Sequence, residues 1–141
     1  MKNHREHEIP KIIYNAIRTP DGTVLVSRHW HDYVSHKDLN GTTYAVDGGL
    51  EYLRRTGGED YEELSLYKED KFEKIRKAFT WGTYGEEHNE KFRWVLLCDM
   101  SDNHIINILT EVCISPLYEW LFTTELGYRN EEEAKKRAEN E

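Results

Sequence analysis

The clearest structural signal lies in the stretch Ile13-Tyr14-Asn15-Ala16-Ile17-Arg18-Thr19-Pro20-Asp21-Gly22-Thr23-Val24-Leu25-Val26-Ser27-Arg28. Its centre, Pro20-Asp21-Gly22, combines a preset φ, a side chain that hydrogen-bonds its own backbone, and a residue that tolerates positive φ. The stretch therefore predicts two strands that are joined by a tight turn.

A second hairpin is predicted directly after the first. Residues 33–36 and 42–46 flank Asp38-Leu39-Asn40-Gly41, and Asn-Gly is the strongest short signal for a hairpin turn. Together the two hairpins predict a meander of four antiparallel strands. A short segment at 50–55 and a polar loop from 56 to about 63 are expected to follow.

The middle of the chain predicts one helix and one strand. A helix is expected over 71–79, because Phe72, Ile75 and Phe79 recur at helical spacing. Asp70 would cap this helix and Gly82 would end it. Residues 92–98 predict a further strand.

Two helices are predicted in the last third of the chain. Ser101 caps the first, whose apolar stripe consists of Ile105, Ile108, Leu109 and Val112. Ser115-Pro116 begins the second, which is expected to break near Gly127. One side of this helix carries Leu117, Trp120, Leu121 and Thr124. Further aromatic surface predicts pairing with a second copy, through Tyr118, Trp120 and Phe122.

The predicted fold class is therefore α+β, with an N-terminal antiparallel β-sheet of hairpins followed by C-terminal α-helices. A chain of 141 residues has the usual size of a single domain, which is expected to span 1–141. Residues 1 to about 10 are expected to be flexible. Residues from about 130 to 141 are expected to form a solvated helical tail, because three glutamates at 131–133 each lie four residues before a basic residue at 135–137 and can pair with it along a helix.

The composition argues against several classes of protein. No run approaches the ~20 apolar residues of a membrane-spanning helix, and residues 1–8 lack the apolar stretch of a secretory signal. A net charge of −8 argues against sequence-independent binding to DNA or RNA, which depends on a basic surface. Cys98 and Cys113 lie in apolar patterns and are expected to be buried free thiols in a reducing compartment.

Histidines gather in the segment Arg28-His29-Trp30-His31-Asp32. In a strand, His29 and His31 would point to the same face, so two imidazoles and the Asp32 carboxylate could hold a metal. A metal-dependent hydrolase or phosphodiesterase is therefore one alternative function. Surface or hydrogen-bonded histidines are the favoured interpretation of the same pattern.

Two adjacent arginines are candidates for holding an anionic ligand. Arg54 and Arg55 lie between glycine pairs at 48–49 and 57–58, where backbone could approach a ligand while guanidinium groups hold phosphate oxygens. A structural role is the alternative, with one arginine paired to a nearby carboxylate, either Asp47 or Glu51.

Residues 80–85, Thr-Trp-Gly-Thr-Tyr-Gly, predict an aromatic, glycine-rich loop at the end of a helix. Such a loop could stack on a nucleobase. The alternative is that Trp81 fills the core beside Phe79. No familiar nucleophile or phosphate-loop motif occurs in the chain, so no catalytic residue is expected.

Several stretches carry a resemblance to a known family. The two longest are Ser27-Arg28-His29-Trp30-His31-Asp32-Tyr33-Val34 and Val46-Asp47-Gly48-Gly49-Leu50-Glu51-Tyr52-Leu53-Arg54-Arg55, with 17–23, 61–65 and 81–83 beside them. They resemble the phage anti-Thoeris sponge family, over nearly all of the chain up to about residue 129. The resemblance implies an N-terminal antiparallel sheet with C-terminal helices, assembly as a dimer or larger oligomer, and capture of the cyclic ADP-ribose isomer gcADPR without cleavage. Some relatives also hold CBASS cyclic oligonucleotides at a separate site.

The resemblance also implies where the ligand binds. Arg54 and Arg55 would face phosphates, and Trp81 or Phe92 would stack on adenine. The expected ligand-binding residues are Arg28, His31, Arg54, Arg55, Trp81, Thr83, Phe92, Asn103 and Arg129. No metal or cofactor is expected, and the partners would be a cyclic nucleotide and further copies of the chain, without membrane, DNA or RNA. The protein would act in immune evasion in the cytoplasm of a bacterial host, and an inhibitor that binds a host protein is the remaining alternative.

Overall fold

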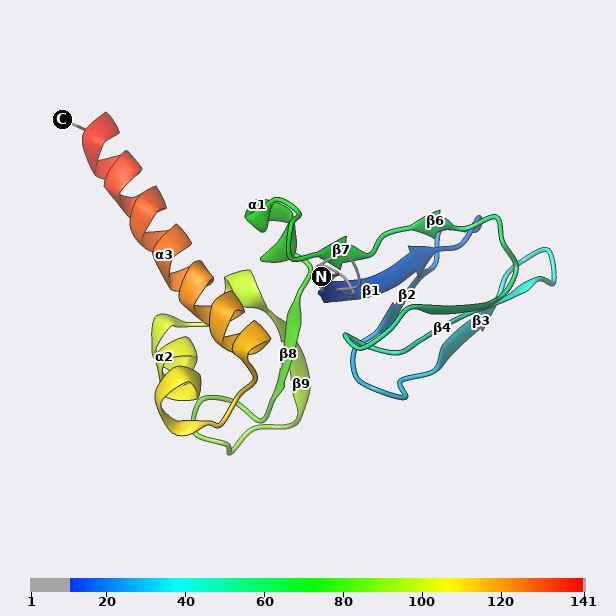
Figure 1. Ribbon diagram of the computed structural model, residues 1–141, viewed down its shortest axis with the longest axis horizontal. Coiled ribbons are helices and arrows are strands. Elements are labelled where there is room, and N and C mark those ends of the chain that lie inside the picture. The colour runs from blue at the N-terminus through cyan, green and yellow to red at the C-terminus, as the bar shows by residue number, and fades with distance from the viewer. Residues whose placement is uncertain (1–10, 141) are drawn as a thin grey trace, which may run out of the picture. The chain divides into compact units, whose positions relative to one another are not determined.

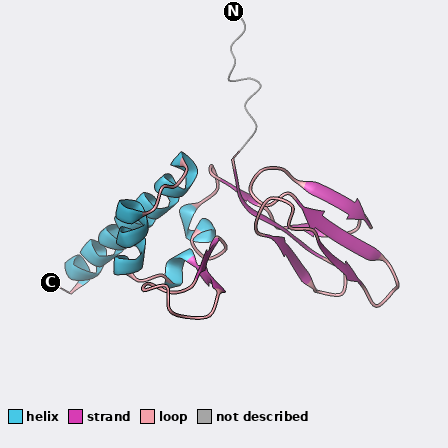
Figure 2. Ribbon diagram, turned by 90° about the horizontal axis from the view of Figure 1, so that it is seen from below, coloured by secondary structure: helices cyan, strands magenta, loops and turns pink. Residues whose placement is uncertain are grey.

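The computed structural model describes residues 11–140, and the chain divides into two compact units, one ending at Ile75 and one beginning at Arg76. Figure 2 shows that strands form most of the first unit, whereas two long helices form most of the second. The predicted α+β class is confirmed, with antiparallel strands first and a long helix last. The single domain 1–141 stays a prediction, and its expected flexible start at 1–10 lies outside the described residues.

The first sheet of the first unit is built on β1 (Ile12–Arg18). β1 pairs antiparallel with β2 (Val24–Ser27), with Ile17 opposite Leu25, which confirms the first predicted hairpin. On its other side β1 pairs with two short strands, β6 (Glu62–Glu63) and β7 (Leu66–Tyr67), which the sequence did not predict.

A second sheet holds β3 (Val34–Lys37), β4 (Thr43–Asp47) and β5 (Arg54–Gly57) in that order. The second predicted hairpin is confirmed, but the meander of four strands is wrong, because β3 does not join the sheet of β2. The loop between them folds back on itself. Arg28 N donates to Asp32 Oδ2 at 2.8 Å and Asp32 N donates to His29 O at 3.0 Å, so the chain turns into the second sheet.

The core of the first unit joins the two sheets. Ile17 and Leu25 from the first sheet cluster with Tyr44 and Val46 from the second. The unit ends with a single helical turn, α1 (Phe72–Ile75).

The helix predicted over 71–79 is therefore too long. After α1 the backbone carbonyls of Arg76 and Phe79 accept hydrogen bonds from Cys98 N and Leu97 N, at 3.0 and 2.9 Å. These partners lie far along the sequence, so they could not be recognised from the helical spacing of the apolar residues.

The second unit starts with the hairpin of β8 (Thr80–Thr83) and β9 (Arg93–Leu96). The strand predicted at 92–98 is thereby confirmed in its central part, and its last residues form the 3₁₀ helix η2 (Leu97–Asp99). Residues 80–83 are a strand and not the predicted glycine-rich loop, since Gly82 lies opposite Trp94 in the antiparallel ladder.

Two helices complete the second unit, α2 (Asp102–Glu111) and α3 (Pro116–Glu139), which pack against each other (Figure 1). Ser101 Oγ accepts a hydrogen bond from His104 N at 3.1 Å, which confirms the predicted cap of α2. The break expected near Gly127 is wrong, because α3 continues through this residue. The side chains of Glu125 and Arg129 on either side of it form an ion pair within the helix, with 2.6 Å between Arg129 Nε and Glu125 Oε2.

Two further differences from the sequence predictions concern Phe122 of α3 and the two cysteines. Phe122 is fully buried and lies edge-on to Phe79 and Trp81, so it does not belong to an exposed aromatic surface. Cys113 is exposed and Cys98 half-buried, so the expectation of two buried thiols is wrong, although both are free. Within residues 11–140, no helix has the length and apolar character needed to cross a membrane.

Candidate functional site

The expected ligand-binding residues fall into both units. Those in the first unit are Arg28, His31, Arg54 and Arg55, and those in the second are Trp81, Thr83, Phe92, Asn103 and Arg129. Each group is described within its own unit.

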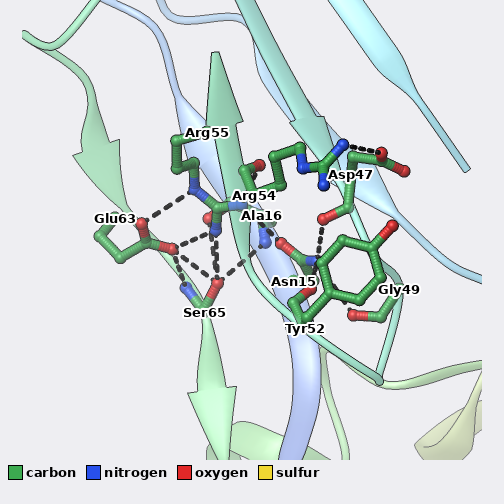
Figure 3. A network of polar contacts seen from close by, with 9 residues as sticks. All are labelled: Asn15, Ala16, Asp47, Gly49, Tyr52, Arg54, Arg55, Glu63 and Ser65. Carbon is green, nitrogen blue, oxygen red and sulfur yellow. Dashed lines mark hydrogen bonds and ion pairs between the residues drawn. The ribbon is translucent and has the colours of Figure 1, made fainter. Parts of the chain in front are cut away.

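Arg55 is the most extensively bonded residue of the first group (Figure 3). Its Nε and Nη2 donate to the two carboxylate oxygens of Glu63 at 3.1 and 2.6 Å, and Nη2 also donates to Ser65 Oγ at 3.0 Å. Nη1 donates to Asn15 Oδ1 at 2.8 Å and to the carbonyl of Arg54 at 3.1 Å. A phosphate could reach this guanidinium only by displacing protein acceptors, so the geometry favours the structural alternative.

Asn15 extends this network into the glycine loop. Its fully buried amide donates from Nδ2 to the carbonyls of Asp47, Gly49 and Tyr52, at 3.0, 2.9 and 3.2 Å. Gly49 N in turn donates to Ser27 Oγ at 2.9 Å. A side chain at Gly49 would be strained at φ +53° and would place its Cβ 2.4 Å from the carbonyl carbon of His29, so glycine is required for these loops to meet.

Arg54, next in the chain, has a different environment. Its side chain is 64% exposed, lies 5.5 Å above the ring of Tyr52, and keeps 4.0 Å between Nη1 and the nearest oxygen of Asp47. Of the two adjacent arginines, Arg54 is therefore the one that presents its guanidinium to solvent.

The histidine segment forms an exposed loop. The ring of His31 stacks on Trp30 with 4.2 Å between centroids, and Trp30 is 62% exposed. His31 has φ +69°, which is uncommon for a residue with a side chain. Arg28 fixes the loop through its backbone N–H, and its side chain is half-buried.

The loop does not gather metal ligands. His29 Nε2 lies 3.8 Å from Asp32 Oδ1, while His31 is engaged with Trp30. Among residues 11–140, no three or more His, Cys, Asp or Glu side chains are grouped so that they could hold a metal ion. Nothing in this geometry favours the metal-dependent hydrolase.

The second unit contains a cavity of about 230 Å³, bounded by β8, the loop that follows it, and α2. Trp81 and Tyr84 contribute aromatic rings to its lining, and Ile108 and Val112 contribute apolar groups. The other side chains that line it are polar or ionisable: Thr83, Glu86, His88, His104, Asn107 and Glu111. We name this space the β8–α2 cavity.

Trp81 packs against two aromatic side chains of α3. Its ring lies edge-on to those of Tyr118 and Phe122 on α3, at centroid distances of 5.5 and 5.2 Å. Trp81 thus packs against aromatic side chains, in line with the alternative that it has a structural role, and it also lines the cavity.

Thr83 and His104 form the most buried polar part of the cavity. Thr83 Oγ1 accepts a hydrogen bond from Gly85 N at 3.0 Å and lies 3.3 Å from His104 Nε2. Burial is the main reason why the pKa of His104 is below its ordinary value. A neutral imidazole at this position can donate or accept a hydrogen bond, depending on its tautomer.

Phe92 lies over Gly82 of β8. A Cβ at Gly82 would come within 2.7 Å of Phe92 Cζ, so the absence of a side chain lets the aromatic ring lie over the strand. Phe92 is 49% exposed and packs edge-on against Tyr84 and Trp94. Of the two residues expected to stack on a base, Trp81 alone lines the β8–α2 cavity.

Asn103 and Arg129, the last two residues expected to contact the ligand, do not line the cavity. Asn103 is exposed near the start of α2 and does not line the cavity. Arg129 connects helix and loop, because its Nη2 donates to the carbonyls of Leu97 and Met100 at 3.1 and 2.7 Å. Its Nε donates to the fully buried carboxylate of Glu125, so Arg129 has a structural environment.

Several cavity residues were not expected as ligand contacts from the sequence. His104, Asn107 and Glu111 follow one another at spacings of three and four residues on α2, which places them on one face of the helix. This spacing was a usable signal. Tyr84 and Glu86 come from the loop after β8, whose position depends on tertiary contacts.

The described geometry defines an α+β protein with an aromatic and acidic cavity in its helical unit. Comparisons with protein-family models, with curated proteins and with solved structures found no match to the chain.

Proposed function

We propose that this protein is a non-catalytic binding protein that sequesters a small nucleotide signal, namely gcADPR, as the family resemblance implies. In this role it would act as a phage anti-defence protein that blocks Thoeris signalling. The observation that supports the proposal most directly is the β8–α2 cavity, whose aromatic rings and polar side chains are the groups that hold a nucleobase in proteins.

The phosphates of such a ligand would lie outside this cavity. Its described lining contains no lysine or arginine. A second depression of about 290 Å³ shares Glu86 and His104 with the cavity, and Arg93 contributes to its lining. Arg93 is 57% exposed and is the one arginine or lysine in the described lining of this depression, so a phosphate would meet its guanidinium there, against repulsion from Glu86, Glu87, Glu90 and Asp99.

The described lining also supports binding without bond cleavage. It contains no cysteine, serine or lysine side chain, and the hydroxyl of Thr83 accepts from Gly85 N within a turn. Catalysis requires interactions that strengthen in the transition state, and these side chains offer no evident nucleophile for that purpose. Assembly as a homo-oligomer and a separate site for CBASS cyclic oligonucleotides belong to the same proposal.

The proposal is tested by calorimetric titration of the full chain with gcADPR. A sponge must compete with a host sensor, so we expect a Kd of about 1 nM or below, which corresponds to about −12 kcal/mol. Asn107→Ala and Asn103→Ala form a matched pair, since both asparagines are exposed on α2 but Asn107 alone lines the cavity. We expect Asn107→Ala to weaken binding about tenfold and Asn103→Ala to leave it unchanged. No heat of binding from the parent protein would contradict the proposal, and equal effects of the two variants would contradict the position of the site.

A further inference from the structure

The size of the β8–α2 cavity limits what can enter it. Pockets for drug-sized ligands measure about 300–1,000 Å³. At about 230 Å³, this cavity is smaller than that range. It therefore has space for one ring system of a larger ligand and leaves the remainder outside.

The charges around the cavity limit its occupant further. Glu86 and Glu111 line it, and the described lining holds no lysine or arginine that would balance them. Glu111 is also the last residue of α2, where the helix ends with its partial negative charge and carries no basic residue in its last turn. An anionic group is disfavoured here, and a group that donates hydrogen bonds or carries positive charge is favoured.

The aromatic side chains point to the shape of the occupant. Trp81 and Tyr84 offer ring surfaces, which attract planar π-systems and cations. On α2, Asn107 and Glu111 are four residues apart and share one face, so an amide oxygen and a carboxylate can accept from the same edge of a planar ligand.

We infer that the β8–α2 cavity selects a planar heterocycle that bears an amino group, and that it recognises this group through the acceptors of Asn107 and Glu111. The inference concerns the cavity of the proposed function and deepens it, because it assigns the ligand class by its hydrogen-bond donors. Phosphate contributes to binding only outside the cavity.

The test uses adenosine and purine riboside as probes with the full chain, because purine riboside lacks the exocyclic amino group and keeps N1 as an acceptor. We expect adenosine to bind about tenfold more tightly than purine riboside, the effect of one charge-assisted hydrogen bond. Glu111→Gln should reduce this preference to about threefold or less, while Glu119→Gln, an exposed position on α3, should retain it. Equal binding of the two nucleosides, or an unchanged preference in Glu111→Gln, overturns the inference.

The same titrations separate this inference from the proposed function. Binding of gcADPR to the parent protein without preference for adenosine overturns the amino-group selection alone. A preference for adenosine with no binding of gcADPR supports the selection and overturns the sponge function. If neither gcADPR nor adenosine binds, both are wrong.

Discussion

Replacing Arg55 with alanine is expected to destabilise the first unit. The change removes five hydrogen bonds made by a side chain that is 14% exposed, and it leaves Asn15 Oδ1 and Ser65 Oγ without their charged donor. A hydrogen bond to a charged group contributes about 1.5–3 kcal/mol to stability. The ion pair between Arg55 and the half-exposed Glu63 contributes less, because solvent screens it. Counting only the bonds to Asn15 and Ser65, at the lower limit, gives a loss of about 3 kcal/mol in the free energy of unfolding.

The neighbouring Arg54 supplies the control. Its side chain is 64% exposed, and its Nη1 lies 4.0 Å from the nearest oxygen of Asp47, which is long for an ion pair. Arg54→Ala should therefore change the free energy of unfolding by no more than about 0.5 kcal/mol. Urea denaturation followed by circular dichroism measures both variants. Hydrogen exchange over β1 and residues 47–52 should show lost protection in Arg55→Ala alone. Equal stability of the two variants would refute the structural role of Arg55.

The same ion pair predicts a dependence on pH. Burial opposes the ionisation of Glu63, but hydrogen bonds from Arg55 and Ser65 together outweigh it and lower the pKa of Glu63 below its ordinary value of 4.5. A lowered pKa stabilises the folded state above the ordinary value, and this stabilisation is lost as the pH falls through the lower folded-state pKa. The difference in stability between the parent and Arg55→Ala should therefore shrink in acid below about pH 4.5 and be constant near neutrality.

Four further predictions concern the second unit and the assembly. Glu125→Ala should lower the free energy of unfolding by about 3–5 kcal/mol in urea denaturation, because Arg76 and Arg129 lose their buried partner, while the exposed Glu133→Ala should stay within about 0.5 kcal/mol. The ring of His104 should titrate below 6.5 by NMR, and the second unit should lose stability as the pH falls from 6.5 through that lower pKa; a pKa at or above 6.5 would refute this. Trp81→Ala should weaken gcADPR binding by ~1–3 kcal/mol, whereas Phe92→Ala, which removes a ring that packs on Tyr84 without lining the cavity, should weaken it less; a larger effect of Phe92→Ala would place the base on Phe92 instead. Light scattering at about 50 µM should give a dimer or larger species, and a monomer would contradict the proposed oligomer.

The parts of the fold that the sequence predicted correctly depend on neighbouring residues. Pro20-Asp21-Gly22 and Asn40-Gly41 determine turns through their own backbone preferences. Ser101 caps α2 by accepting a hydrogen bond from His104 N, only three residues further along the chain. These features require no knowledge of distant contacts. The positions of β1 to β4 and the start of α2 follow from them.

The parts that could not be predicted depend on partners far along the chain. β5 is polar in sequence and becomes a strand only because β4 pairs with it. Arg55 finds Asn15 forty residues away, so a phosphate contact and a structural contact could not be distinguished beforehand. The end of α1 at Ile75, before the predicted end at Phe79, likewise depends on distant partners, because Cys98 N and Leu97 N donate to the carbonyls of Arg76 and Phe79.

We propose that the protein binds its ligand without changing it. The most direct measurement is mass spectrometry of the small molecule released when a purified complex with gcADPR is heated until the protein unfolds. We expect stoichiometric release of intact gcADPR that is again active on its sensor. Linear ADP-ribose or any other product would contradict it, and would make Thr83 and His104, with 3.3 Å between Oγ1 and Nε2, the pair to test for catalysis.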